Sequence, residues 1–392
     1  MPSPDPRITA FSFRRQRLDG SAAGALDAVA AVVGVYSAMP GGPLSIRARA
    51  AGVTADAVRD LERSRSALRM RAMRTSAFLV PVASAARIAA ATAVPESRFR
   101  WLLRAAGVTD AELPAVRGAV LGVAHEPGTV GELRARLAAR GLDQETAPWT
   151  GGPALGRVLS YMTGFGQLAA IGQESLSSNA LRYVDRRSWF GDASDEPGAT
   201  TRADPVESRA WLARAYLRAF GPARLEDLAW WAGWSRTTAE TALAAHDTVE
   251  LDGRRRLLSD DVAVLEATPP LSDRITLLPK WDAWTMGYPL DGRDRLLDMT
   301  VHDRVFDGDG NGLAMVLRAG RAIGAWSHRG ERGTMAVDLD LFERVTANER
   351  GAIDAELAGI AAFLGYRGTT VREVGTVIPD RRRMRRPLVP VD

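Results

Sequence analysis

The sequence contains no cysteine, and this absence excludes several kinds of chemistry at once. Without thiols the chain cannot form disulfides, zinc–thiolate sites, iron–sulfur clusters or a cysteine nucleophile. Histidine is also scarce, because the four histidines lie far apart in the sequence and form no HExxH pair. The sequence therefore predicts no metal site and no cofactor.

Long apolar runs are missing as well. No window holds eighteen consecutive apolar residues, and no cleavable signal pattern opens the chain. We therefore expect a cytoplasmic, soluble protein with no membrane partner. The 392 residues are too many for one ordinary core, and 46% hydrophobic residues are enough for a fully folded chain of two to four domains.

Lysine is almost absent, whereas arginine is abundant. Lys280 is the single lysine among 51 basic residues, and the formal net charge is +4. Arginine offers planar, bidentate contacts to phosphates and to base edges. A genome rich in G and C would also favour arginine over lysine, so the positions of the arginines carry more information than their number.

The stretch from Val32 to Arg49, VVGVYSAMPGGPLSIRAR, contains a helix–turn–helix junction. Apolar residues at helical spacing precede it, and we expect their helix to run through Tyr36, Ser37 and Ala38 to the Pro-Gly-Gly-Pro turn. Pro43 then begins a second helix. Side chains at such a junction face outward from a rigid support. The junction is therefore a candidate site for binding or chemistry, and a turn with a surface tyrosine is the alternative.

The segment after the junction predicts a winged helix. Thr54 is expected to cap a third short helix, and the following ALRMRAM alternates apolar residues with Arg69 and Arg71. This alternation predicts a strand with one apolar and one basic face, and a second strand, TSAFLVP, follows at once. Three helices followed by a two-stranded hairpin form a winged helix.

The same order of helices and a hairpin returns twice. Between about residues 99 and 192, helical patterns with a capping box at Thr129 and Glu132 precede two extended segments, QLAAIG and ALRYVDRRSWF. The third copy ends in two strands joined by Asp252-Gly253, which is a strong hairpin signal. Its neighbouring tryptophans at 230, 231 and 234 are expected in the core. One repeated unit is the economical interpretation.

Beyond residue 270 the pattern changes to alternating strands with one helix near the end. It predicts an antiparallel sheet or small β-barrel with a covering helix. The expected fold class is therefore α+β, with three tandem winged-helix units before this last domain. The predicted domains are 1–98, 99–192, 205–268 and 269–392, with a linker at 193–204. The basic run 381–386 is expected to be a solvated tail.

Several arginines are candidates for contacts with phosphate. They come from two elements that one small winged-helix domain would bring together, and phosphate binding needs such convergence. A solvated face of salt bridges is the alternative. The candidates for DNA binding are Arg47, Arg49, Arg69, Arg71 and Arg74.

In their order and spacing, these pieces resemble the winged-helix DNA glycosylase family of the AlkZ and YcaQ type. The matching segments include RRQRLDG, VVGVYSAMPGGPLSIRAR, RSALRMRAMRTSAFLVP, FGPARLEDLAWWAGW, LLPKWDAWTMGY and RAGRAIGAWSH. The resemblance implies three winged-helix units and a C-terminal barrel around double-stranded DNA. It also implies DNA repair by hydrolytic removal of bulky N7-alkylated or crosslinked purines.

The sequence departs from this family at its water-positioning pair. The resemblance implies Gln-x-Gln or Gln-x-Asp at the junction, where this chain has Tyr36 and Ala38. Alanine can neither orient nor deprotonate water, and a phenol with a pKa of about 10 is a poor base. The histidine that follows Met-Arg-Gly-Thr in the family is replaced too, within Met73 to Phe78. Asp282 matches a family position, and a structural hydrogen-bond acceptor is its alternative role.

These observations predict a monomeric, DNA-binding relative of the N-glycosylases, acting on damaged double-stranded DNA with altered or lost base excision. The candidate catalytic positions are Tyr36, Ser37, Ala38 and Asp282. Two alternatives stay open. One is a non-enzymatic binder that recognises lesions or regulates transcription, and the other is a scaffold recruited to different chemistry.

Overall fold

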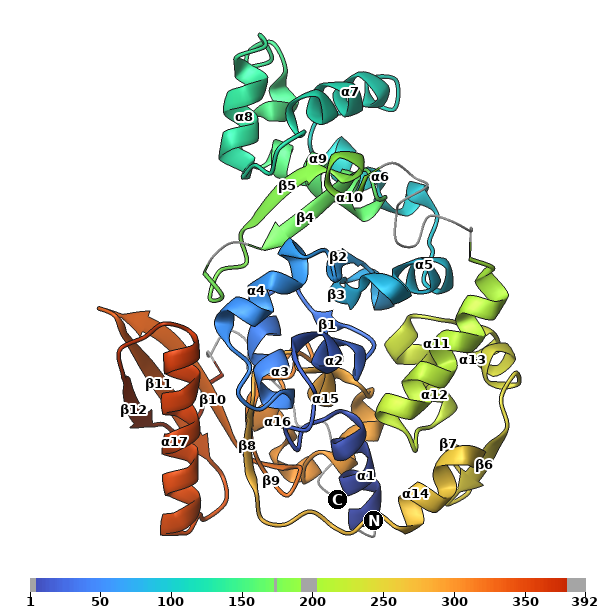
Figure 1. The fold of residues 1–392 in the computed structure, drawn as a ribbon, viewed down its shortest axis with the longest axis vertical. Coiled ribbons are helices and arrows are strands. Elements are labelled where there is room, and N and C mark those ends of the chain that lie inside the picture. Colours follow the sequence, from blue (N-terminus) through green and yellow to red (C-terminus); the bar gives the residue numbers. More distant parts are fainter. Residues whose placement is uncertain (1–4, 173–174, 192–202, 379–392) are drawn as a thin grey trace. The chain divides into compact units, whose positions relative to one another are not determined.

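The computed structural model describes residues 5–172, 175–191 and 203–378 (Figure 1). The fold is mixed α+β, with many helices and several small sheets. Two compact units are each assembled from separate pieces of the chain, and they are described one at a time. Unit 1 comprises Met1–Tyr36, Gly41–Val58 and Ala210–Asp392, and unit 2 comprises Ser37–Pro40 and Arg59–Arg209. The predicted four-domain division stays a prediction. The predicted basic tail and most of the predicted linker lie outside the described residues.

Unit 1 begins with the junction seen in the sequence. Its first elements are α1 (Pro6–Arg15), α2 (Ala25–Ala30), β1 (Val35–Tyr36) and α3 (Gly42–Arg49). The predicted helix through Ala38 is wrong, because α2 ends at Ala30 and Tyr36 is extended. The β-branched Val33 and the neighbouring Gly34 oppose a helix here, and Val33 takes a left-handed φ of 68°. Pro43 lies in the first turn of α3, as predicted.

The predicted third repeat contributes helices and a hairpin to unit 1. Asp252 and Gly253 form its left-handed turn, with φ of 49° and 71°, as predicted. Trp231 is buried, with its ring centroid 4.9 Å from that of Tyr216, so it is a core residue as expected. Trp230 and Trp234 are half-buried. The elements are α11 (Pro205–Phe220), which begins in unit 2, then α12 (Leu225–Ala232), α13 (Arg236–Leu243), β6 (Thr248–Leu251), β7 (Arg255–Leu258) and α14 (Val262–Glu266).

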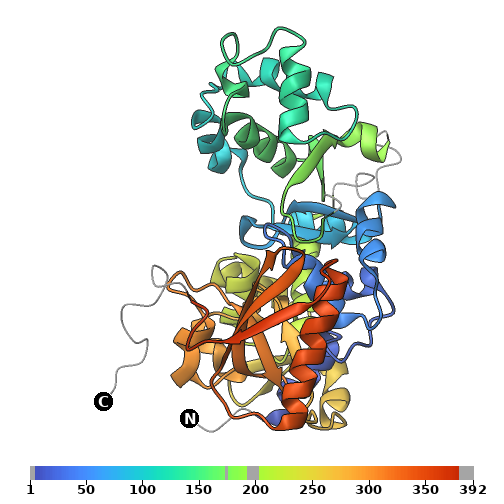
Figure 2. The same ribbon diagram turned by 90° about the vertical axis from the view of Figure 1, so that its left-hand side faces the viewer.

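A five-stranded sheet completes unit 1. Its strands pair in the open order β12-β11-β10-β9-β8. Of the two predicted forms, a sheet or a small β-barrel, the chain therefore forms a sheet. All described pairs are antiparallel except β11 with β12, which is parallel. The helix α17 packs on this sheet through Ile353, Leu357 and Ile360 (Figure 2). The elements are β8 (Ile275–Leu278), α15 (Ala283–Met286), α16 (His302–Val305), β9 (Ala314–Arg318), β10 (Arg321–Glu331), β11 (Thr334–Leu341), α17 (Ala347–Phe363) and β12 (Thr369–Glu373).

Unit 2 contains two antiparallel hairpins and a helical core. Thr129 and Glu132 form the predicted capping box at the start of α8. The end of ALRYVDRRSWF is helical rather than extended, because the Asp185 side chain accepts from the Ser188 N–H and caps a short helix. The elements are α4 (Ala55–Arg63), which begins in unit 1, β2 (Ala67–Arg71), β3 (Ala77–Pro81), α5 (Val82–Ala91), α6 (Arg100–Arg104), α7 (Leu113–Val123), α8 (Val130–Ala138), α9 (Ala154–Gly164), β4 (Leu168–Gly172), β5 (Leu181–Asp185) and α10 (Arg186–Phe190).

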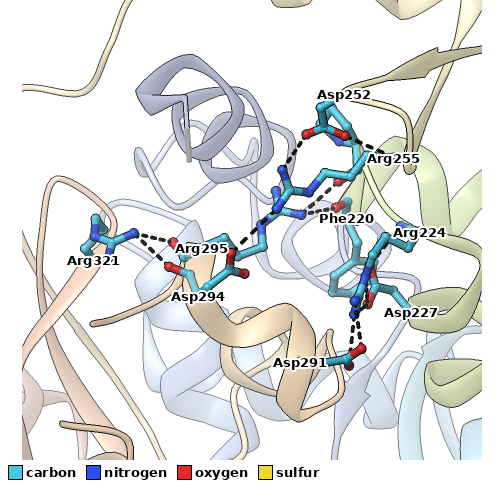
Figure 3. Close-up of polar contacts among 10 residues, drawn as sticks. Phe220, Arg224, Asp227, Asp252, Arg255, Asp291, Asp294, Arg295 and Arg321 are labelled. Atoms are coloured by element: carbon cyan, nitrogen blue, oxygen red, sulfur yellow. Dashed lines mark hydrogen bonds and ion pairs between the residues drawn. The ribbon is translucent and has the colours of Figure 1, made fainter. Parts of the chain in front are cut away.

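Arginines hold together the interior of unit 1 (Figure 3). Arg224 pairs with Asp227 in its own helix start and with Asp291, whose oxygen lies 2.8 Å away. Arg295 is buried, and it donates to the Pro222 carbonyl at 2.8 Å and to the Ser12 hydroxyl at 2.6 Å. Part of the arginine content therefore serves the fold itself.

Candidate nucleic-acid interface

Tyr36 lies beside Trp281, which is distant in sequence. The ring centroids are 5.6 Å apart with an interplanar angle of 49°, and both side chains are half-buried in unit 1. Trp281 has a φ of 58°, a conformation that is rare for a bulky residue and that concentrates at functional sites. Its indole Nε1 donates to Asn311 Oδ1 at 3.1 Å. The two rings form a fixed aromatic pair at the junction.

The single lysine of the chain is next to this pair. Lys280 Nζ lies 4.3 Å from the Trp281 ring centroid and 3.8 Å from Asp307 Oδ2. Asp307 is buried, and its two carboxylate oxygens accept from Asn311 Nδ2 at 3.1 and 3.2 Å. A positive charge is thereby held over one aromatic face, where the ring quadrupole attracts it.

Asp282 follows Trp281, and its carboxylate points into the interior. It forms two bonds of 2.8 Å with Arg49, and neither side chain is exposed to solvent. Arg49 also donates to the buried Gln16 Oε1 at 3.2 Å, while Asp282 accepts from the Trp284 N–H at 2.8 Å. Both groups therefore have partners inside unit 1, and the phosphate contact of Arg49 and the catalytic role of Asp282 stay predictions.

Ser37 and Ala38 belong to unit 2. The Ser37 N–H donates to the Ala77 carbonyl at 2.9 Å, and its own carbonyl accepts from Arg69 Nη1 at 3.1 Å. The Ser37 hydroxyl is buried and has no partner among the described residues. Ala38 is exposed. At these two positions, only the backbone of Ser37 is held by the β2–β3 hairpin.

The β2–β3 hairpin of unit 2 carries three of the five predicted arginines. Arg69 pairs with Glu62 through bonds of 2.8 and 3.1 Å. The Arg71 guanidinium lies 3.7 Å from the Phe99 ring centroid, and burial lowers the pKa of Arg71. Arg74 is exposed in the turn, with a φ of 52°. Basic groups therefore follow one another along this hairpin, and their contact with phosphate stays a prediction.

Arg47 lies in unit 1 and pairs with Glu356 of α17 at 2.5 Å. The described residues contain no cluster of histidine, aspartate and glutamate that could hold a metal ion. In the part of the chain that the structure describes, no helix is long and apolar enough to cross a membrane.

Sequence reasoning did not identify Trp281, Lys280, Asp307 or Asn311 as parts of the junction. The lone lysine was a visible signal, since Lys280 stands directly before a tryptophan in an arginine-rich chain. Lys280 comes near Tyr36 only through the contact between Tyr36 and Trp281, which are about two thirds of the chain apart in sequence. Local sequence patterns carry no information about such a contact.

The model of the AlkZ-like DNA glycosylase family matches residues 31–363 of this chain. The match spans most of the sequence, and the chain therefore belongs to this family. Among solved structures, the DNA glycosylase AlkZ of Streptomyces sahachiroi is similar, with a TM-score of 0.70 and 23% identity. The likeness covers 94% of this chain and 99% of that chain, and it shows a common fold. No curated protein matches the sequence.

Proposed function

We propose that this protein binds double-stranded DNA carrying N7-alkylated or crosslinked purines and that its excision of the damaged base is altered or lost. The observation that carries the proposal is the Tyr36–Trp281 aromatic pair, with ring centroids 5.6 Å apart. By resemblance, Tyr36 and Ala38 occupy the positions of the family's water-positioning pair.

The chemistry of the lesion suits an aromatic site. Alkylation at N7 makes the purine cationic, so the glycosidic bond already tends to break toward an oxocarbenium ion. Aromatic faces attract cations, and Tyr36 supplies such a ring beside Trp281, whose one face already holds the Lys280 ammonium. Hydrolysis additionally needs a positioned water and stabilised charge at the sugar. Ala38 has no polar side-chain atom, and the Ser37 hydroxyl is buried. Binding is thus favoured over hydrolysis.

The DNA contact is proposed to use the β2–β3 hairpin of unit 2. Arg69, Arg71 and Arg74 would contact backbone phosphates, which fix position without reading sequence. The helices followed by hairpins support three winged-helix units within 1–98, 99–192 and 205–268, followed by the domain 269–392. We propose that the protein acts as a cytoplasmic monomer.

The test uses one DNA duplex with and without a single N7-alkylguanine. Fluorescence anisotropy measures binding, and alkaline strand cleavage of the same samples measures abasic sites. We expect tighter binding to the alkylated duplex and base release little above the spontaneous rate. Tyr36→Leu should remove the preference for the lesion, whereas Trp101→Leu, at an exposed tryptophan of unit 2, should not.

Two outcomes would overturn parts of this proposal. Equal affinity for both duplexes, without release, would refute lesion recognition and favour a regulatory DNA binder. Rapid release by the unaltered protein would refute the loss of excision, and its abolition by Tyr36→Phe would identify the phenol as part of a reworked catalytic site.

A further inference from the structure

A cavity of unit 2 is lined by β2, by α5 and by the end of α9. Its volume is about 400 Å³. Small side chains of α5, among them Ala85, Ala86 and Ala89, form one wall, and Phe165 lines the cavity as well. This size, together with a mainly apolar lining that holds a few polar groups, is typical of sites for small molecules.

The charged residues that line this cavity carry one sign only. Arg71 of β2 and Arg186 of α10 belong to the lining, and no aspartate or glutamate among the described residues does. An anion in the cavity would therefore meet positive charge without competition from a carboxylate of the lining.

The Arg71 side chain has no hydrogen bond and no ion pair within residues 5–172, 175–191 and 203–378. Its Nη1 is enclosed without a partner, whereas Nε and Nη2 are not enclosed. Burial lowers the pKa of Arg71, because its charge is partly removed from water. An oxyanion at Nε and Nη2 would supply the acceptors that the described chain does not provide.

Apolar contacts hold this guanidinium at the cavity wall. Its Cζ lies 3.7 Å from the ring centroid of Phe99 and 5.6 Å from that of Phe165. A Cβ on Gly164 would come within 2.5 Å of Cζ and 2.6 Å of both Nη atoms, so the plane of the guanidinium lies against this glycine. Gly164 and Phe165 both line the cavity. The cation is thus positioned without using its N–H groups, whose edge suits a bidentate carboxylate.

We infer that this cavity binds a small organic carboxylate, with the carboxylate at Arg71 and an apolar body against Ala86, Ala89 and Phe165. The charge of the lining selects an anion. The apolar wall favours an anion that carries hydrocarbon over a bare inorganic ion, because burial of hydrocarbon surface adds binding free energy. The site does not rest on the proposed function, since neither Tyr36 nor DNA takes part in it.

The first arm of the test compares three anions by calorimetry with the full-length protein. Benzoate, acetate and inorganic phosphate are each titrated. We expect benzoate to bind about tenfold more tightly than acetate, because its ring adds apolar surface to be buried. We also expect it to bind more tightly than phosphate. Acetate that binds as tightly as benzoate, or phosphate that binds more tightly, would overturn the proposed ligand class.

The second arm removes the positive charge. Arg71→Met should weaken benzoate binding about tenfold or more, as the loss of charged hydrogen bonds does. The control Arg104→Met removes an equal charge from an exposed position of α6 outside the lining, and it should change the affinity less than about twofold, because exposed charges are screened. Equal effects of the two variants would refute a site at Arg71.

The third arm adds a negative charge to the lining. Ala89→Glu places a carboxylate in the cavity, where it repels the ligand and competes for the arginines, and it should weaken benzoate binding about tenfold or more. Ala83→Glu adds the same charge to the same helix, at an exposed position outside the lining, and it should have little effect. Similar affinities in the two variants would contradict the assigned cavity.

Thermal unfolding verifies that each variant is folded. Absence of benzoate binding to the unaltered protein at millimolar concentrations would overturn the inference outright. The titrations contain no DNA and the lesion assay contains no benzoate, so the failure of one proposal is distinguishable from the failure of the other.

Discussion

Arg49 and Asp282 form an ion pair in which neither side chain reaches solvent. Their two bonds of 2.8 Å join α3, which follows the junction, to the turn that carries Trp281. Desolvation offsets much of the attraction within such a pair, so its effect lies more in fixing geometry than in adding stability. The ion pair therefore fixes the turn that carries Trp281, one of the two rings of the aromatic pair.

Removing one partner of this pair should be costly. Asp282→Ala would leave the Arg49 charge buried without its counter-ion, and we expect a loss of about 3–5 kcal/mol in the free energy of unfolding. Urea denaturation measures this loss. The control Asp110→Ala breaks an exposed pair with Arg100 and should cost less than about 1 kcal/mol. Similar losses in both variants would contradict a structural role for Asp282.

The basic hairpin predicts a salt-dependent effect. Replacing Arg69 and Arg71 with alanine should weaken DNA binding and reduce the salt slope by about 2, one for each lost phosphate contact. To bind phosphate, Arg69 must exchange its pair with Glu62, and Arg71 must leave the face of Phe99. Anisotropy titrations at several salt concentrations measure both quantities. A double variant at exposed Arg236 and Arg329 has the same net charge, and an equal change in its slope would refute the assignment.

His302 predicts a loss of stability in acid. Burial, and then the charge of Arg293, lower the pKa of His302 from 6.5 to about 4. Between these two pH values, His302 binds a proton in the unfolded chain and not in the folded chain. The contribution of the neutral His302 to the free energy of unfolding is therefore complete above pH 6.5 and is lost as the pH falls toward 4. Urea unfolding across this range measures the free energy of unfolding, which should depend less on pH in His302→Gln than in the unaltered protein. A matched change at exposed His125 should leave the profile unaltered, and a profile unaffected by His302→Gln would refute the prediction.

The capping box of α8 predicts a modest effect. Thr129 accepts from the Glu132 N–H at 3.2 Å, and the Glu132 carboxylate accepts from the Thr129 N–H at 2.7 Å. Thr129→Ala should lower the free energy of unfolding by about 1 kcal/mol, because the N–H loses its acceptor. Thr129→Ser retains the hydroxyl, and its urea midpoint should stay near that of the unaltered protein. Equal midpoints for the alanine and serine variants would contradict this account.

Signals between close neighbours in the sequence predicted much of the fold. The Thr129 cap, the Pro43 helix start and the Asp252-Gly253 hairpin all depend on residues within one turn of each other. The junction was harder to predict, because the apolar spacing before Tyr36 continues a helical pattern although the helix itself ends at Ala30.

The candidate site was less accessible to sequence reasoning than the fold. Tyr36 was identified from its position, but its partner Trp281 comes from a distant turn. Arginine spacing suggested a shared basic face and could not reveal which arginines have internal partners. Arg49, for example, is one of the predicted DNA contacts, and nothing in the sequence indicated that it pairs with Asp282 inside unit 1.

The single lysine has a practical consequence. An amine-directed reagent has one side-chain target in the entire sequence, and that target stands over the Trp281 ring. Acylation would erase the ammonium charge beside the junction while leaving every arginine intact. Among the side chains, ordinary amine labelling is therefore directed to a single site.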